Sequence, residues 1–340
     1  MRTRIPAICL LATLLVTSLG LSTFRAADTL PTALTDQAFW KMISDFSEVG
    51  GSFVFDMYMS NEVTFQEILP ELLRRVTPGG VYLGVAPEQN FTYIEVLQPK
   101  MAFIIDIRRE NMLEMLMYKA LFELSPTRAE FVSRLFSRPI RPGLAPQASV
   151  EQVFGALISG RGDPQLYAQN LRAIKEHLEK THGFPLTAKD MRTIEEIFNL
   201  FYRGGPDASL TNYGTSYRLL MRETDRQGRN RNFLASDSNY QFVRDMHMKN
   251  LIVPIVGDFA GPKAIAAVAG YVRQRGAQVN VFYVSNVEEY IQSPASVWNA
   301  YCRNIAALPI NSTSTFIRFG RGGRGSCLGS MSSFATSCRR

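Results

Sequence analysis

The stretch 79–111, GGVYLGVAPEQNFTYIEVLQPKMAFIIDIRREN, decides the expected fold. Residues 81–85 (VYLGV) and 101–107 (MAFIIDI) are short apolar runs bounded by turn residues, which predicts two buried strands. The segment between them, NFTYIEVLQP, predicts a short helix that stops at Pro99. Strand, helix and strand in this order form the skeleton of a nucleotide-binding unit, but the glycine-rich turn of such units is missing.

The same alternation returns in residues 250–286, NLIVPIVGDFAGPKAIAAVAGYVRQRGAQVNVFYVSN. Residues 251–256 and 279–284 predict two further strands. Pro262 suits the first helical position, and Gly276 suits the end of the helix that precedes the second of these strands. Two strand–helix–strand units predict an α/β fold with a doubly wound, mostly parallel sheet.

The region between these units has a different pattern. It contains amphipathic helical segments, of which the clearest has Thr187 as N-cap, Asp190 three residues later and Gly204 at its end. We therefore expect a largely helical insertion in the sheet domain. The predicted organisation is a leader (1–27), the first half of the Rossmann-like domain (28–124), the helical insertion (125–232), the second half of that domain (233–318) and a disordered Gly/Ser/Arg-rich tail (319–340).

The N-terminus predicts export from the cytoplasm. A short basic start is followed by an apolar run over residues 5–21 and then by small residues, the order of a secretory signal peptide with cleavage near Ala26 or Ala27. The alternative is an uncleaved membrane anchor, since the apolar run is near the shortest length that spans a bilayer. Either way we expect a periplasmic or extracellular protein whose only membrane contact is this segment.

The formal charge of +7 is concentrated at the two ends of the chain. The first 26 residues contain three arginines and no acid, and residues 318–340 contain five arginines and no acid. The segment between them is therefore close to neutral, which argues against a nucleic-acid-binding surface. The sequence carries no signal for an oligomeric state.

Cysteine and histidine give weak signals. The chain has an odd number of cysteines outside the leader, which does not indicate a disulfide framework. Cys327 and Cys338 either form a disulfide with each other or stay as free thiols. The histidines lack the usual metal-ligand spacing, so we expect no metal site and solvated roles for His177 and His182.

Polar side chains follow the predicted strands at the edge where such sheets bind ligands. Glu88 and Asn90 follow the first strand, and Asp106 ends the second. Asp258 and Asn286 follow the two later strands. Because the carboxyl ends of parallel strands meet at one edge, we expect these side chains to converge on one pocket.

Asp106 follows Gly84 by 22 residues, the separation expected of an acid that accepts hydrogen bonds from ribose hydroxyls. The alternative is an ion pair with Arg108 or Arg109 at the end of the strand. For Asn90 the alternative to a binding role is the N-cap of the following helix.

The loop GVAPEQN contains one glycine, a proline and a carboxylate. Repeated glycines let backbone N–H groups approach a pyrophosphate, so this loop disfavours a dinucleotide. A ligand without phosphate, such as S-adenosylmethionine, tolerates the carboxylate, and its amino group favours one.

Four stretches carry a family resemblance: SNEVTFQEILPEL, residues 79–111, NRNFLASDSNYQF, and IVPIVGDFAGPKAIAAVAGYVRQRGAQVNVFYVSNVEEYI. They resemble an uncharacterised bacterial family with a class I S-adenosylmethionine-dependent methyltransferase-like fold, over residues 45–318. The resemblance implies that Gly84, Glu88 and Asn90 form the first cofactor loop and that Asp106 binds the ribose.

It also implies that Asp258 lies near the methyl group, as a candidate general base. Asn61 and Glu62 would fold over the pocket, or cap the following helix, and Asn286 would line the substrate side. The sequence thus supports two hypotheses, a methyltransferase-like protein with S-adenosylmethionine as cofactor and an exported, non-catalytic protein that binds a small molecule or a partner. A nicotinamide-dependent oxidoreductase is the weaker third.

Overall fold

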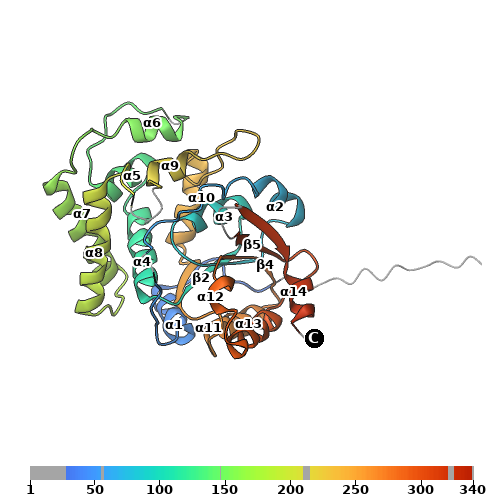
Figure 1. Ribbon diagram of the computed structural model, residues 1–340. Coiled ribbons are helices and arrows are strands. Elements are labelled where there is room, and N and C mark those ends of the chain that lie inside the picture. The colour runs from blue at the N-terminus through green and yellow to red at the C-terminus, as the bar shows by residue number, and fades with distance from the viewer. Residues whose placement is uncertain (1–27, 55–56, 146, 210–214, 321–324, 339–340) are drawn as a thin grey trace, which may run out of the picture.

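The centre of the molecule is a six-stranded sheet with the order β3-β2-β1-β4-β5-β6 (Figure 1). The computed structural model describes residues 28–54, 57–145, 147–209, 215–320 and 325–338. The strands are β1 (Val81–Gly84), β2 (Met101–Asp106), β3 (Ile252–Val256), β4 (Val279–Ser285), β5 (Thr315–Phe319) and β6 (Ser326–Ser330). The structure thus confirms an α/β fold on a mostly parallel sheet.

Strands β1 to β5 are parallel, and β6 runs antiparallel to β5 at the edge. All residues of β1, β2 and β3 are buried, which explains why these strands read as uninterrupted apolar runs. The chain winds from β1 outward to β3 and then returns to β4 on the other side of β1. This reversal between β1 and β4 is the position at which sheets of this kind form a ligand crevice.

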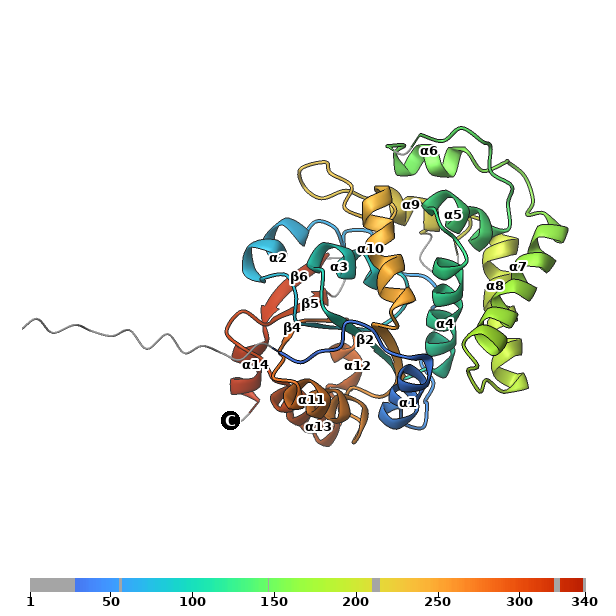
Figure 2. The same ribbon diagram turned by 180° about the vertical axis from the view of Figure 1, so that it is seen from behind.

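Helices cover both faces of the sheet, as the two opposite views show (Figures 1 and 2). Helices α3 and α10 lie on one face, and α11 and α13 lie on the other with α1 beside them. The helices that belong to the sheet layers are α1 (Asp36–Phe46), α2 (Leu69–Arg75), α3 (Gln89–Leu97), α4 (Arg109–Glu123), α10 (Asp237–Met248), α11 (Ala264–Gln274), α12 (Glu288–Ile291), α13 (Ala295–Ala307) and α14 (Met331–Ser337).

The chain between β2 and β3 forms a helical layer outside α4 (Figure 1). Its elements are α5 (Arg128–Phe136), α6 (Val150–Gly155), α7 (Pro164–Glu176), the π-helical turn η1 (His177–Thr181), α8 (Ala188–Gly204) and α9 (Tyr217–Arg222). The expected start of α8 is confirmed, because Thr187 and Asp190 form a reciprocal capping box. The five α-helices lie within the predicted insertion, 125–232.

Two expected helix starts are wrong. The helix expected to follow Asn61 and Glu62 begins only at Leu69, as α2, and Pro70 lies in its first turn because its missing N–H needs no partner there. Asn61 and Glu62 therefore cap no helix. Similarly, α11 begins at Ala264, and Pro262 precedes it in the turn after β3.

The prediction of a disordered tail is also wrong for the described part of it. Residues 326–330 form β6 and residues 331–337 form α14. A disulfide joins Cys302 of α13 to Cys338, and Cys327 is a free, exposed thiol. The backbone of β5 supplies the pairing groups for β6, so this strand forms without an apolar side-chain pattern.

The expected solvated roles of His177 and His182 are wrong as well. Both rings lie against Glu123 of α4 and are mostly shielded from solvent, with side-chain exposures of 17% and 10%.

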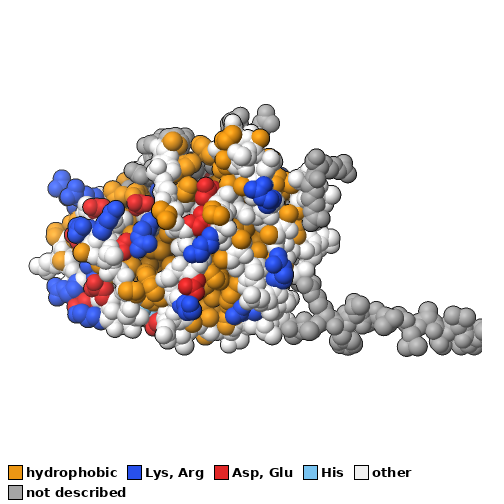
Figure 3. All heavy atoms as spheres, turned by 90° about the horizontal axis from the view of Figure 1, so that it is seen from below, with side chains coloured by type: hydrophobic (Ala, Val, Ile, Leu, Met, Phe, Trp, Pro, Cys, Tyr) orange, Lys and Arg blue, Asp and Glu red, His pale blue; other side chains and the backbone are white. Residues whose placement is uncertain are grey.

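No helix in the described ranges is long and apolar enough to cross a bilayer. The predicted signal peptide or anchor, residues 1–27, lies outside the described residues. On the face in Figure 3, Lys and Arg side chains are interspersed with acidic and hydrophobic side chains.

Candidate functional site

A cavity of about 670 Å³ lies where the carboxyl ends of the five parallel strands meet. Segments that follow each of these strands contribute to its wall, and the N-terminal stretches 52–53 and 57–64 cover it. The lining side chains that come from the strand ends, from the segments after them or from the N-terminal stretches include Asn61, Glu62, Val85, Ala86, Asp106, Arg108, Asp258, Ser285, Asn286, Glu289 and Phe319. Of the side chains expected to converge on one pocket, Asp106, Asp258 and Asn286 line this cavity.

Asp106 lines this cavity at the end of β2. Its Oδ1 accepts a hydrogen bond from the backbone N–H of Arg108 (2.9 Å) and lies 3.6 Å from Nε of the same arginine. Burial raises the pKa of Asp106, and the Arg108 guanidinium partly opposes this shift. The ribose-binding role and the ion pair with Arg108 are therefore both compatible with the position of Asp106, because the ion pair exists and the residue still borders the cavity.

Glu62 reaches the cavity from the N-terminal segment and contacts the far end of β4. Its Oε1 accepts hydrogen bonds from the Tyr283 hydroxyl (2.8 Å) and the Ser285 hydroxyl (2.5 Å). Its Oε2 accepts one from Nε2 of Gln89 (3.0 Å). Burial raises the pKa of Glu62 while these three donors oppose the shift. The segment thus closes over the cavity through a buried carboxylate.

Asn61, Asp258 and Asn286 also line the cavity, as their positions in the sequence predict. Oδ1 of Asp258 accepts a hydrogen bond from the N–H of Ala260 (2.8 Å), which shapes the turn after β3.

The three remaining predicted residues, Gly84, Glu88 and Asn90, do not line the cavity. Nδ2 of Asn90 donates to the carbonyl oxygens of Val85 and Ala86 (2.8 Å each) and so holds the loop from behind. A Cβ atom on Gly84 would overlap the Asn90 side chain, so the glycine makes room for that contact. The expectation that these three face a ligand is therefore not met.

Glu88 is fully buried behind the same loop. It accepts a hydrogen bond from the backbone N–H of Ser60 (3.1 Å), and burial raises its pKa to about 7. Glu114 of α4 lies near it, also fully buried, and burial raises the pKa of Glu114 well above its usual range. The Glu88 carboxylate, which the sequence predicts to repel phosphate, thus lies in the core and does not line the cavity.

Aromatic side chains form a part of the wall that the sequence did not reveal. Phe53 of the covering segment packs edge-on against Tyr290, with ring centroids 4.8 Å apart. Phe259, from the segment after β3, and Phe319, at the end of β5, add two further rings. They come from four distant parts of the chain, so no local pattern marks them as neighbours.

The cavity combines these rings with an excess of acids. Of the described residues, Glu62, Asp106, Asp258 and Glu289 line it, against the single cation Arg108. Such a wall favours a ligand that carries positive charge and a flat apolar group, and it disfavours phosphate.

A comparison with curated proteins finds no match to this chain. Residues 57–327, most of the chain, match the family described as Domain of unknown function (DUF7790). The matched range contains β1 to β5 and the loops that build the cavity wall at their ends. The chain therefore belongs to the DUF7790 family.

Proposed function

We propose that the cavity binds S-adenosylmethionine and that the protein is methyltransferase-like. The observation that carries this proposal is the acidic and aromatic wall at the carboxyl ends of the parallel strands, where a doubly wound sheet binds nucleoside ligands. S-adenosylmethionine carries a sulfonium and an ammonium group together with an adenine ring and has no phosphate. The family resemblance of the sequence supports the same ligand.

In this arrangement Asp106 accepts hydrogen bonds from the ribose hydroxyls, since it ends β2 and borders the cavity. The acidic side chains of the wall attract the sulfonium and ammonium groups. Asn61, Glu62 and Asn286 line the part of the cavity available to an acceptor. Gly84, Glu88 and Asn90 do not line the cavity and instead fix the shape of the loop that follows β1.

Catalysis rests mainly on alignment of the acceptor with the methyl group, because the sulfonium is already activated. Asp258 is the candidate base for an acceptor that must lose a proton, as its carboxylate borders the cavity. A dinucleotide fits less well, since among the described residues of the wall Arg108 is the only cation that could pair with a phosphate.

Calorimetric titration of the purified full-length chain with S-adenosylmethionine and S-adenosylhomocysteine tests the proposal. We expect saturable binding of both ligands to the wild-type chain. For Asp106→Asn we expect an affinity lower by about 10- to 100-fold, because the ribose hydroxyls lose their hydrogen bonds to a charged acceptor. The matched control is Asp245→Asn, an exposed aspartate of α10, with unchanged affinity. No heat at millimolar ligand in the wild-type chain contradicts the proposal.

The second candidate is an exported, non-catalytic protein that uses the same cavity for another small molecule. The Cys302–Cys338 disulfide favours it, because disulfides persist in oxidising compartments, whereas S-adenosylmethionine is made in the cytoplasm. Fractionation of bacteria expressing the full chain separates the two candidates. A shortened, disulfide-bonded chain in the periplasm supports export, and a full-length, reduced chain in the cytosol supports the methyltransferase-like function.

A further inference from the structure

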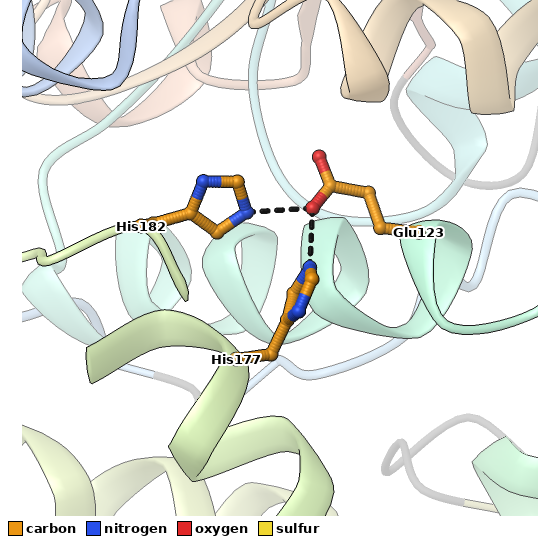
Figure 4. Close-up of side chains that lie close together, drawn as sticks. All are labelled: Glu123, His177 and His182. Atoms are coloured by element: carbon orange, nitrogen blue, oxygen red, sulfur yellow. Dashed lines mark hydrogen bonds and ion pairs between the residues drawn. The ribbon is translucent and has the colours of Figure 1, made fainter. Parts of the chain in front are cut away.

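Three potential metal ligands converge outside the cavity, between α4 and the helical layer (Figure 4). Nε2 of His177 and Nε2 of His182 each lie 2.6 Å from the same oxygen, Oε2 of Glu123. The three donor atoms lie within 4.8 Å of one another. No other group of three or more His, Cys, Asp or Glu side chains in the described residues meets in this way.

The backbone explains how two histidines five residues apart reach one point. In an α-helix they would point about 140° apart, because each residue turns the chain by about 100°. Here α7 widens into the π-helical turn η1, and the N–H of His182 bonds to the carbonyl oxygen of His177 (3.1 Å). The wider turn brings both rings to Glu123. Single π-helical turns inside α-helices occur frequently at functional sites.

The surroundings fix the orientation of His182. Its Nδ1 lies 2.7 Å from Oδ1 of Asp36, which also accepts a hydrogen bond from Asn250 (2.9 Å). A carboxylate bonded to the second nitrogen of a metal-binding histidine is the usual support of such a ligand. Lys119 contacts the other carboxylate oxygen of Glu123, so Oε2 remains for the histidines.

Both ring nitrogens of His182 face carboxylate oxygens, on Asp36 and on Glu123. When a cation is bound at Nε2, the other nitrogen still donates its N–H to Asp36.

We propose that the chain binds one zinc ion through Nε2 of His177, Nε2 of His182 and Oε2 of Glu123, with Asp36 as the positioning residue for His182. Imidazole nitrogen with one carboxylate is a zinc-type donor set, at about 2.0–2.2 Å from the ion. The ligand atoms lie at hydrogen-bond distances of 2.6 Å, so the two rings must rotate outward to admit the ion. Three protein ligands leave a fourth position, open to water or an added ligand.

The proposed zinc site is separate from the cavity, since none of its three ligands lines the cavity. It would join α4 of the sheet layers to η1 of the helical layer, and through Asp36 also to α1. Zinc binding is therefore expected to stabilise the attachment of the helical layer. This inference does not depend on the proposed function.

The test is metal binding by the full-length chain after treatment with EDTA. Equilibrium dialysis against Zn²⁺ with elemental analysis is expected to give one zinc per chain, and Co²⁺ is expected to give the visible absorption of a tetrahedral site. The melting temperature should rise when Zn²⁺ is added and fall back to its metal-free value when EDTA removes the ion. A wild-type chain that holds no zinc and does not change in melting temperature overturns the proposal.

The variants locate the site. His177→Gln and His182→Gln can still donate a hydrogen bond to Glu123, so the fold should persist while the zinc affinity falls at least 10-fold. Asp36→Asn should keep one zinc per chain with about 10- to 100-fold weaker affinity, as expected of a positioning residue. The control is Lys180→Gln, an exposed side chain in the same turn, with unchanged binding. Wild-type affinity in both histidine variants, folded as judged by circular dichroism, also overturns the proposal.

Discussion

Gly84 of β1 and Asn90 of α3 are packed so closely that a Cβ atom at residue 84 would overlap Oδ1 of Asn90. The same asparagine oxygen accepts a hydrogen bond from the Tyr82 hydroxyl (2.8 Å), and its amide nitrogen bonds to loop carbonyls. The shape of the first loop therefore depends on the absence of a side chain at residue 84.

Replacement of this glycine should destabilise the fold. For Gly84→Ala we expect a decrease of about 1–3 kcal/mol in the free energy of unfolding, because the added methyl group displaces Asn90 from a filled core. Urea denaturation measures the change. In Gly270→Ala, the same substitution in α11 with open space around the new Cβ, stability should instead rise by about 0.5–1 kcal/mol. Equal effects of the two substitutions would contradict the packing described.

Burial of Glu88 should make stability depend on pH. Its pKa is about 7 in the folded chain, above the usual value of 4.5, so folding favours the protonated form. The stability that this proton provides is fully present below about pH 4.5 and is lost as the pH rises through about 7. Burial also raises the pKa of Glu114, the nearby buried acid, well above its usual range.

We therefore expect the wild-type chain to lose about 3 kcal/mol relative to Glu88→Gln between pH 4.5 and pH 7, from about 1.4 kcal/mol per unit of pKa. Urea denaturation across this pH range gives the difference. Glu196→Gln, an exposed glutamate of α8, serves as the control and should follow the wild-type profile. A constant difference between wild type and Glu88→Gln would show that Glu88 is ionised in the folded state.

Arg128 is a buried connection between α5 and the start of α10. Its guanidinium donates to the carbonyl oxygens of Leu234 (2.8 Å) and Ala148 (2.6 Å) and pairs with Asp237 (2.6 Å). Arg128→Met leaves the carbonyl oxygens of Leu234 and Ala148 buried without this donor, so the free energy of unfolding should fall by about 2–5 kcal/mol. Arg172→Met, an exposed arginine of α7, should change it by less than about 0.5 kcal/mol in the same denaturation experiment.

The disulfide makes a prediction that distinguishes the three cysteines outside the leader. Peptide mapping without reduction should recover Cys302 linked to Cys338, while Cys327 reacts with an alkylating reagent. Loss of this bridge in Cys302→Ser should lower the free energy of unfolding by about 2–4 kcal/mol, because it closes a long loop of the unfolded chain. Cys327→Ser should leave stability unchanged. A Cys327–Cys338 linkage in the map would reject this pairing.

Features with local causes could be predicted from the sequence. The capping box of Thr187 and Asp190 needs only residues three apart, and the apolar runs of β1 and β2 reflect burial on both faces. Asp106 could be placed at the cavity because it ends a strand, and the ends of parallel strands share one edge. For the same reason the cavity contains Asp258 and Asn286.

The rest could not be predicted, because it depends on neighbours that are distant in the chain. Glu88 follows β1 just as Asp106 ends β2, yet one carboxylate is turned into the core and the other borders the cavity. No local pattern separates the two, since the direction of each side chain follows from how α3 and α4 pack. Strand β6 has a composition typical of disorder and forms because the edge of β5 offers backbone partners.

The sequence by itself determined the alternation of strands and helices, because burial and turn formation are recorded in local apolar runs, glycines and prolines. Only the tertiary structure decided which polar groups meet. His177 and His182 become neighbours of Glu123 through a π-helical turn and the packing of that turn on α4. The acids and rings of the cavity wall likewise come from separate segments that the sheet brings together. Contacts of this kind are set by packing across long distances in the chain, which local spacing does not record.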